Sequence, residues 1–165
     1  MAKKDITITL YVSEIVYEIK NKTHITGLMY READAVAAAN RQVTDEEACM
    51  NQIMRSVGDA CGTLRHTLSE YLKAETTSGG KTDNIQTDGE VGKIEFTLSM
   101  PSNFNKALVG SISAGMHRYI VDEAISLWFG MTGKEDAAQY ATYAAADLEA
   151  LRLAVNERVR PQRPE

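Results

Sequence analysis

The feature that most constrains this fold is an apolar stripe between residues 44 and 72. Apolar side chains recur there at steps of three and four residues, which places them on one face of a helix. The stripe consists of Met50, Met54, Val57, Cys61, Leu64, Leu68 and Tyr71. A second stripe of this kind consists of Ala137, Ala141, Ala144, Leu148, Leu151 and Val155. Two long helices that pack side by side are therefore predicted.

Both predicted helices have a recognisable start. Thr44 and Glu47 have the spacing of a capping box, in which the hydroxyl and the carboxylate each accept a backbone amide of the first turn. Thr132 and Glu135 have the same spacing. The sequence therefore predicts that the two helices begin at these pairs and that the second ends near Arg158, shortly before a proline.

Two glycines lie one turn apart within the first of these helices. Gly58 and Gly62 each weaken a helix by about 1 kcal/mol relative to alanine. Without Cβ atoms, however, they allow another backbone to approach closely. We expect a packing notch at this point.

Two short segments alternate apolar and polar residues, as half-buried strands do. They are residues 5–12 and 93–100. The alternation predicts a pair of strands, formed either within one chain or with a strand of a neighbouring subunit. A ribbon of two strands is only marginally stable, so it must lie against the helices or extend a larger sheet.

Shorter helices are predicted between the first strand and residue 44. Ser13 can cap a helix over residues 14–20, although alternating apolar residues leave a continued strand possible. Gly27 is expected to end this unit, and an Ala-rich segment predicts a further helix over residues 31–41.

A third long helix is predicted after the second strand, from Pro101 to about Phe129. Its segment 110–115 contains small residues that suit tight helix contact. A polar connection of residues 75–92 precedes the second strand, and loops of this length in a compact domain are usually functional. The prediction is thus a mainly α fold: a bundle of three long helices, shorter N-terminal helices and a two-stranded β element. Residues 1–160 form one domain, and residues 161–165 an exposed arm.

Composition excludes some partners. The chain has 165 residues and a net charge of −5, which argues against sequence-specific nucleic-acid binding and against an anionic membrane surface, because phosphates attract clustered Lys and Arg. No apolar run approaches the about 18 residues of a membrane span, and the N-terminus lacks the apolar region of a signal peptide. We expect a cytoplasmic protein or one assembled into a particle. Cys49 and Cys61 are expected to be buried small hydrophobic residues.

No catalytic signature stands out. Residues 78–82 resemble the end of a phosphate-binding P-loop, but the required first glycine and the following helix are missing. His66 and Glu70 lie four residues apart on the predicted helix, a spacing that fits a surface pair as readily as two ligands of a metal ion. His117 does not share a helical face well with the acidic pair Asp122–Glu123. We therefore predict a non-enzymatic protein without metal or cofactor.

Interaction residues are a further expectation. Tyrosine rings suit interfaces, where one end stays wet, and this chain has seven. The residues we expect to contact partners are Tyr11, Lys81, Phe96, Tyr140, Tyr143, Arg160 and Arg163.

The general build is similar to that of small connector or neck proteins of tailed bacteriophages and prophages. The similarity covers residues 6–12, 75–100 and 158–165: a strand pair, a long polar loop and a basic arm. It implies a structural subunit that forms homo-oligomers and contacts other assembly proteins of a virion through protein-protein interaction. The alternative is a small-molecule-binding or regulatory helical-bundle protein with a pocket near Gly58, Cys61, Gly62 and segment 110–115.

Overall fold

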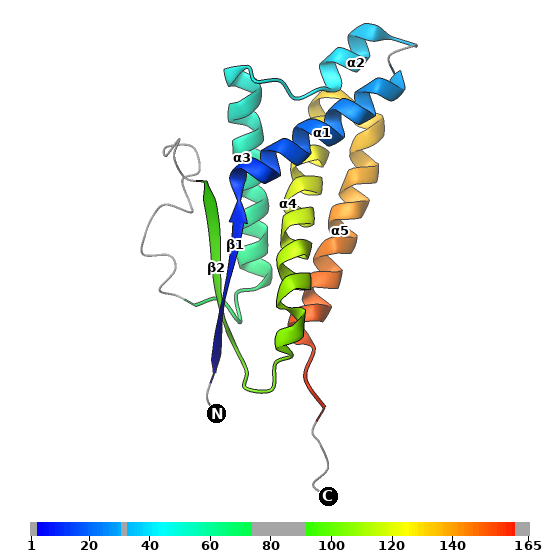
Figure 1. The fold of residues 1–165 in the computed structure, drawn as a ribbon. Helices are drawn as coiled ribbons and strands as arrows, with labels where there is room; N and C mark the ends of the chain where they lie inside the picture. Colours follow the sequence, from blue (N-terminus) through cyan, green and yellow to red (C-terminus); the bar gives the residue numbers. More distant parts are fainter. Residues whose placement is uncertain (1–2, 31–32, 74–91, 161–165) are drawn as a thin grey trace, which may run out of the picture.

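The computed structural model describes residues 3–30, 33–73 and 92–160 (Figure 1). These residues are mainly helical, which confirms the mainly α class. The elements in chain order are β1 (Lys4–Tyr11), α1 (Val12–Tyr30), α2 (Ala35–Arg41), α3 (Glu47–Thr67), β2 (Lys93–Met100), a 3-10 turn (Lys106–Leu108), α4 (Val109–Thr132) and α5 (Lys134–Asn156). Most of the polar connection and the whole arm 161–165 lie outside the described residues.

The two predicted strands pair with each other within one chain. β1 and β2 are antiparallel, in a register that runs without interruption from Lys4 opposite Met100 to Tyr11 opposite Lys93. Three helices separate them in the sequence, so they do not form a simple hairpin. The apolar side chains of one face are buried, as period-two alternation requires: Ile8, Leu10, Ile94, Phe96, Leu98 and Met100.

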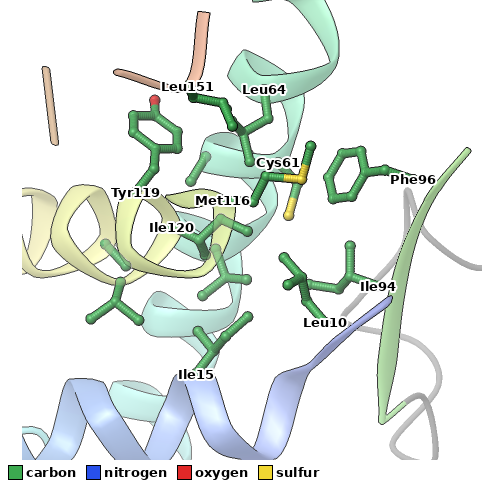
Figure 2. Packing of buried hydrophobic residues seen from close by; sticks show 14 of the residues in the cluster. Leu10, Ile15, Cys61, Leu64, Ile94, Phe96, Met116, Tyr119, Ile120 and Leu151 are labelled. Atoms are coloured by element: carbon green, nitrogen blue, oxygen red, sulfur yellow. The ribbon is translucent and has the colours of Figure 1, made fainter. Parts of the chain in front are cut away.

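Helix α4 lies between α3 and α5, and the sheet packs on the side of α3 and α4 (Figure 1). The core is a single cluster drawn from all these elements. Figure 2 shows its centre, where Met116 and Ile120 of α4 lie among Cys61 and Leu64 of α3 and Ile94 and Phe96 of β2. Cys61 is buried as expected, and burial raises the pKa of its thiol to about 12.

Helix α1 differs from its prediction. It begins at Val12, directly after β1, and continues to Tyr30, so the predicted range 14–20 was too short. Gly27 does not end the helix but lies inside it, where α2 approaches. A Cβ atom at Gly27 would stand 2.9 Å from the backbone oxygen of Ala38. The glycine is thus required by a close contact and not by a helix end.

Neither predicted capping box forms. Helix α3 begins at Glu47 after Glu46, whose side chain caps nothing, and the Thr44 hydroxyl donates to Cys49 Sγ instead. The Thr132 hydroxyl belongs to α4 and donates to the backbone oxygen of Trp128, four residues earlier. Neither threonine is the N-cap residue, because the N-cap positions are occupied by Glu46 and Gly133.

Two further predictions were wrong. Among the described residues, no atom outside the neighbouring helix backbone lies within 4 Å of a Cβ atom built at Gly58 or Gly62, so none of these residues crosses α3 closely there. Helix α4 begins at Val109 and not at Pro101. The segment between them forms turns, and the Asn105 side chain accepts a hydrogen bond from the amide of Ala107 at the start of the 3-10 turn.

Candidate interaction surface on helix α1

The inner face of α1 holds the helix against the molecule. Its buried residues are Val12, Ile15, Ile19, Thr23 and Gly27. The Thr23 hydroxyl donates to the backbone oxygen of Ile19 at 2.8 Å and accepts the backbone amide of Val43 at 3.3 Å. Helix α1 is thereby tied to the segment that leads into α3, and it lies across the helical layer (Figure 1).

The C-terminal end of α1 is anchored by a buried arginine of α2. The Arg41 guanidinium lies 3.9 Å from the ring centre of Tyr30 and donates from Nε to Asp136 of α5 at 3.1 Å. The Tyr30 hydroxyl donates to the other oxygen of Asp136 at 2.9 Å, and the Trp128 indole donates to the backbone oxygen of Arg41 at 2.9 Å. The N-terminal end follows β1 directly, and the amide of Val12 donates to the backbone oxygen of Gly92 at 3.0 Å, so both ends of α1 are held in place.

The outer face of α1 carries large apolar side chains that nothing covers among the described residues. Tyr17, Ile25, Leu28 and Met29 are 72%, 52%, 42% and 80% exposed. Tyr17, Asn21, Ile25 and Leu28 follow one another at steps of four, four and three residues, so they lie along one side of the helix. We call Tyr17, Ile25, Leu28 and Met29 the α1 surface. A helix covered on one side only usually has a polar outer face. Here four large apolar side chains share the outer face with the exposed polar residues Ser13, Glu14, Asn21 and His24.

A groove adjoins the N-terminal half of the α1 surface. One opening of about 440 Å³ is lined by Ser13, Glu14, Tyr17, Glu18, Asn21 and His117. A second opening of about 490 Å³ shares Glu14 and His117 and continues toward β1, between Thr9 or Tyr11 on one side and Gly110, Ser113 and Ala114 on the other. The groove therefore runs from the end of β1 along the line where α1 meets α4.

An ionic network joins α1 to α4 at this groove. His117 Nε2 lies 2.6 Å from Glu18 Oε2. Lys22 Nζ lies 3.3 Å from Glu18 Oε1 and 2.8 Å from Asp122 Oδ1. The two carboxylates thus share one ammonium group between the two helices, and His117 completes the chain of contacts.

The network shifts three pKa values. Burial alone would raise the pKa of Glu18, but the hydrogen bond with His117 and the charge of Lys22 outweigh it, so this pKa is lowered. Burial opposes the charged form of Lys22, yet Asp122 and Glu18 together raise the pKa of the ammonium group. Burial raises the pKa of Asp122 despite its contact with Lys22. Lys22 thus opposes the effect of burial on Asp122.

Glu18 and His117 are lining residues of the groove that form a contact between helices, since they meet at hydrogen-bond distance. Together with Lys22 and Asp122 they hold α1 against α4. Within residues 3–30, 33–73 and 92–160, no three His, Cys, Asp or Glu side chains gather as a metal ion would need. None of the helices in these ranges combines the length and hydropathy required for a bilayer crossing.

The interaction residues expected from sequence lie in different places. Tyr11 is 47% exposed and lines the groove. Tyr143 is exposed and Tyr140 is half-buried, with its hydroxyl 3.2 Å from that of Thr26. Arg160 is exposed near the C-terminus. Of these residues, the groove contains Tyr11 alone, and Lys81 and Arg163 lie outside the described residues.

Phe96 was wrongly expected to contact a partner. It is fully buried beneath β2, next to Cys61 of α3 (Figure 2). Its place on the inward face follows from the alternation of the strand, in which it shares a face with Ile94 and Leu98. Its ring therefore stabilises the core.

Sequence reasoning missed the α1 surface because it ended the helix at residue 20. The signal was present in the spacing of Tyr17, Ile25 and Leu28. The contact between Glu18 and His117 joins residues 99 positions apart, and no local pattern marks it. Comparisons of the chain with protein-family models, with curated proteins and with solved structures find no match.

Proposed function

We propose that this protein is a non-enzymatic structural or assembly protein that acts through protein-protein contacts, with the α1 surface as a contact area. The observation that carries this proposal is the exposure of Tyr17, Ile25, Leu28 and Met29 on one side of a helix that is fixed at both ends.

Exposing apolar side chains to water is unfavourable in free energy, so large exposed apolar groups need a reason. Scattered apolar residues are common on protein surfaces, but contiguous ones usually mark interaction sites. Val36 of α2, which is 70% exposed, adds a further apolar side chain near the end of α1. Tyr and Met, which this surface contains, are enriched at protein interfaces. Covering these side chains would remove apolar area from water at roughly 25 cal/mol per Å².

The narrower proposal is a subunit of a phage or phage-like particle that forms homo-oligomers. In that role α3, α4 and α5 act as a scaffold bundle. The α1 surface, the strand pair and the segments at the polar loop and the C-terminus contact neighbouring subunits or other assembly proteins. The support is the general build together with the fixed, uncovered α1 surface.

The test is the solution mass of the full chain by sedimentation velocity, from low to high micromolar concentration. We expect a mass above the 18.2 kDa of one chain that rises with concentration. Replacing Tyr17, Ile25 and Met29 together by Ser should return the protein to a monomer. A monodisperse wild-type monomer that also recovers no assembly partner would contradict the proposal.

A matched control uses exposed apolar residues elsewhere. Leu153 and Val159 are 67% and 53% exposed and lie away from α1, on α5 and near the C-terminus. The double replacement of these residues by Ser removes a comparable kind of side chain. It should leave the association of the wild-type chain in place. Equal loss in both variants would show that the association is unspecific.

A second candidate function is the binding of a small ligand. The two openings of the groove have volumes in the range typical of ligand sites. The second opening borders Gly110, Ser113 and Ala114, in the small-residue segment of the alternative prediction, but Gly58 and Gly62 do not line either opening. Thermal-shift screening separates the two functions: a ligand that raises the midpoint, with the effect lost in His117→Ala, favours this candidate.

A further inference from the structure

One edge of β1 offers unused backbone groups. In an antiparallel pair, alternate residues point their N–H and C=O groups toward the partner strand and away from it. The amide of Val12 donates to the oxygen of Gly92 at 3.0 Å, which continues the register of the sheet and places even-numbered residues on the paired side. The backbone groups of Thr7, Thr9 and Tyr11 therefore point to the opposite edge, where the described residues give them no backbone partner.

The outer edge of β2 differs in this respect. The amide of Lys73 donates to the oxygen of Thr97 at 2.9 Å, and the amide of Ser99 donates to the oxygen of Tyr71. Residues 71–73 thus cover that edge. They also confirm the alternation, because Thr97 and Ser99 lie opposite Thr7 and Asp5 of β1.

Two common protections of edge strands, a proline and a bulge, are absent from β1. Such strands are commonly blocked by proline, by a bulge or by a covering segment. β1 contains no proline, and its eight residues pair with β2 without a bulge. Beside the edge runs the opening of about 490 Å³, whose far wall is formed by residues of α4: Gly110, Ser113, Ala114, His117 and Arg118. The first three of these have small or no side chains, which leaves room there for the side chains of an added strand.

Charge at the end of the groove favours one kind of strand. Glu14 lines both openings next to Tyr11, and it is in none of the ion pairs among the described residues. Arg118, which lines the second opening, is already paired with Asp147 at 3.4 Å. A strand that runs antiparallel to β1 would place its amino-terminal end beside Glu14. A Lys or Arg at that end would meet the carboxylate.

We propose that the free edge of β1 binds an extended segment of another protein chain, which adds to the sheet as an antiparallel third strand. The segment alternates apolar residues toward α4 with polar residues toward solvent, and carries Lys or Arg near its amino-terminal end. The inference rests on the proposed function as an assembly protein, and it names the kind of partner segment. Backbone hydrogen bonds supply the affinity, and the alternating side chains with Glu14 supply the direction.

The test uses a defined peptide and the full chain. A ten-residue peptide with the sequence of residues 3–12, blocked at both ends, has the required alternation and two lysines at its amino-terminal end. It is titrated into isotope-labelled protein and followed by NMR. We expect saturable shifts in the amides of Thr7, Thr9 and Tyr11 and in Gly110 and Ala114. The absence of binding at millimolar peptide, or shifts confined to other elements, would overturn the proposal.

Proline at the free edge gives a selective variant. Thr9→Pro removes an N–H that points away from β2 and is tolerated at such positions of an edge strand. It should weaken peptide binding at least about tenfold, whereas Thr9→Ser should bind like the wild type. Equal binding of Thr9→Pro would contradict strand addition. If this variant does not fold, a peptide N-methylated at the amides that face β1 replaces it, with the same tenfold loss expected.

The contact between the peptide lysines and Glu14 is tested separately. Replacing both peptide lysines by Gln should weaken binding to the wild type several-fold, and Glu14→Gln should remove that difference. An unchanged difference would overturn the assigned direction. The Tyr17, Ile25 and Met29 triple variant should still bind the peptide, so failure of strand addition and failure of the proposed contact at α1 are separate results.

Discussion

Helices α4 and α1 differ in how far their apolar side chains are buried. Helix α4 lies between α3 and α5 and beneath the sheet, and it buries residues around most of its circumference, from Ile112 to Phe129. Helix α1 is covered on one side only, yet it presents large apolar residues on both sides. Burial explains the apolar residues of α4 through stability. It does not explain those on the outer side of α1, for which we propose contacts with other molecules.

The largest effect is expected where α4 meets the core. Phe129 is fully buried and its ring centre lies 5.5 Å from that of Tyr140. Phe129→Ala removes this ring and leaves a cavity, so the free energy of unfolding should fall by about 4 kcal/mol. Urea denaturation measures the change. A loss below about 1 kcal/mol would mean that α4 is not the centre of the core.

The next effect tests the joint between the two helices. Lys22→Met removes the cation between Glu18 and the buried Asp122, which would keep a carboxylate without its partner. We expect a loss of about 2 kcal/mol, below the full effect for a buried pair because Lys22 is partly exposed. The double variant Lys22→Met, Asp122→Leu should recover most of the loss. If it is as unstable as the single variant, the ion pair does not govern this contact.

A smaller effect is expected on the inner side of α1. Gly27→Ala places a Cβ atom 2.9 Å from the backbone oxygen of Ala38, which a rigid backbone cannot easily avoid. The strain exceeds the gain in helix propensity of about 1 kcal/mol, and a net loss of about 1 kcal/mol should result. Gly58→Ala on α3 meets nothing within 4 Å and is the matched control, which should be neutral or stabilising.

Local patterns predicted the elements of this fold better than their contacts. The alternation in residues 5–12 and 93–100 predicted both strands, and the steps of three and four predicted the helix now seen from Glu47 to Thr67. The pairing of the two strands was predicted, but whether it forms within one chain or between chains was not, because β1 and β2 are joined across almost the whole length of the first 100 residues. The capping boxes failed because side-chain spacing alone does not fix where a helix begins.

The candidate site, too, could be predicted from local patterns only in part. The spacing of Tyr17, Ile25 and Leu28 predicts the α1 surface, but only if the helix is taken to continue through Gly27. Taken from the sequence alone, Gly27 indicates a helix end. In the structure it allows the backbone of Ala38 in α2 to approach α1 closely. The groove needs β1, α1 and α4 together, so its residues are spread from Thr9 to Arg118. Such a surface is specified only by the complete fold.

We propose that the α1 surface contributes to contacts with other molecules and not to folding. This is measured by the free energy of unfolding of the variant in which Tyr17, Ile25 and Met29 are replaced by Ser, taken by urea denaturation at submicromolar concentration, where association is minimal. We expect a value within about 0.5 kcal/mol of the wild type, as is usual for exposed positions. A loss of about 2 kcal/mol or more would show that these side chains stabilise the subunit itself, and the proposal would be wrong.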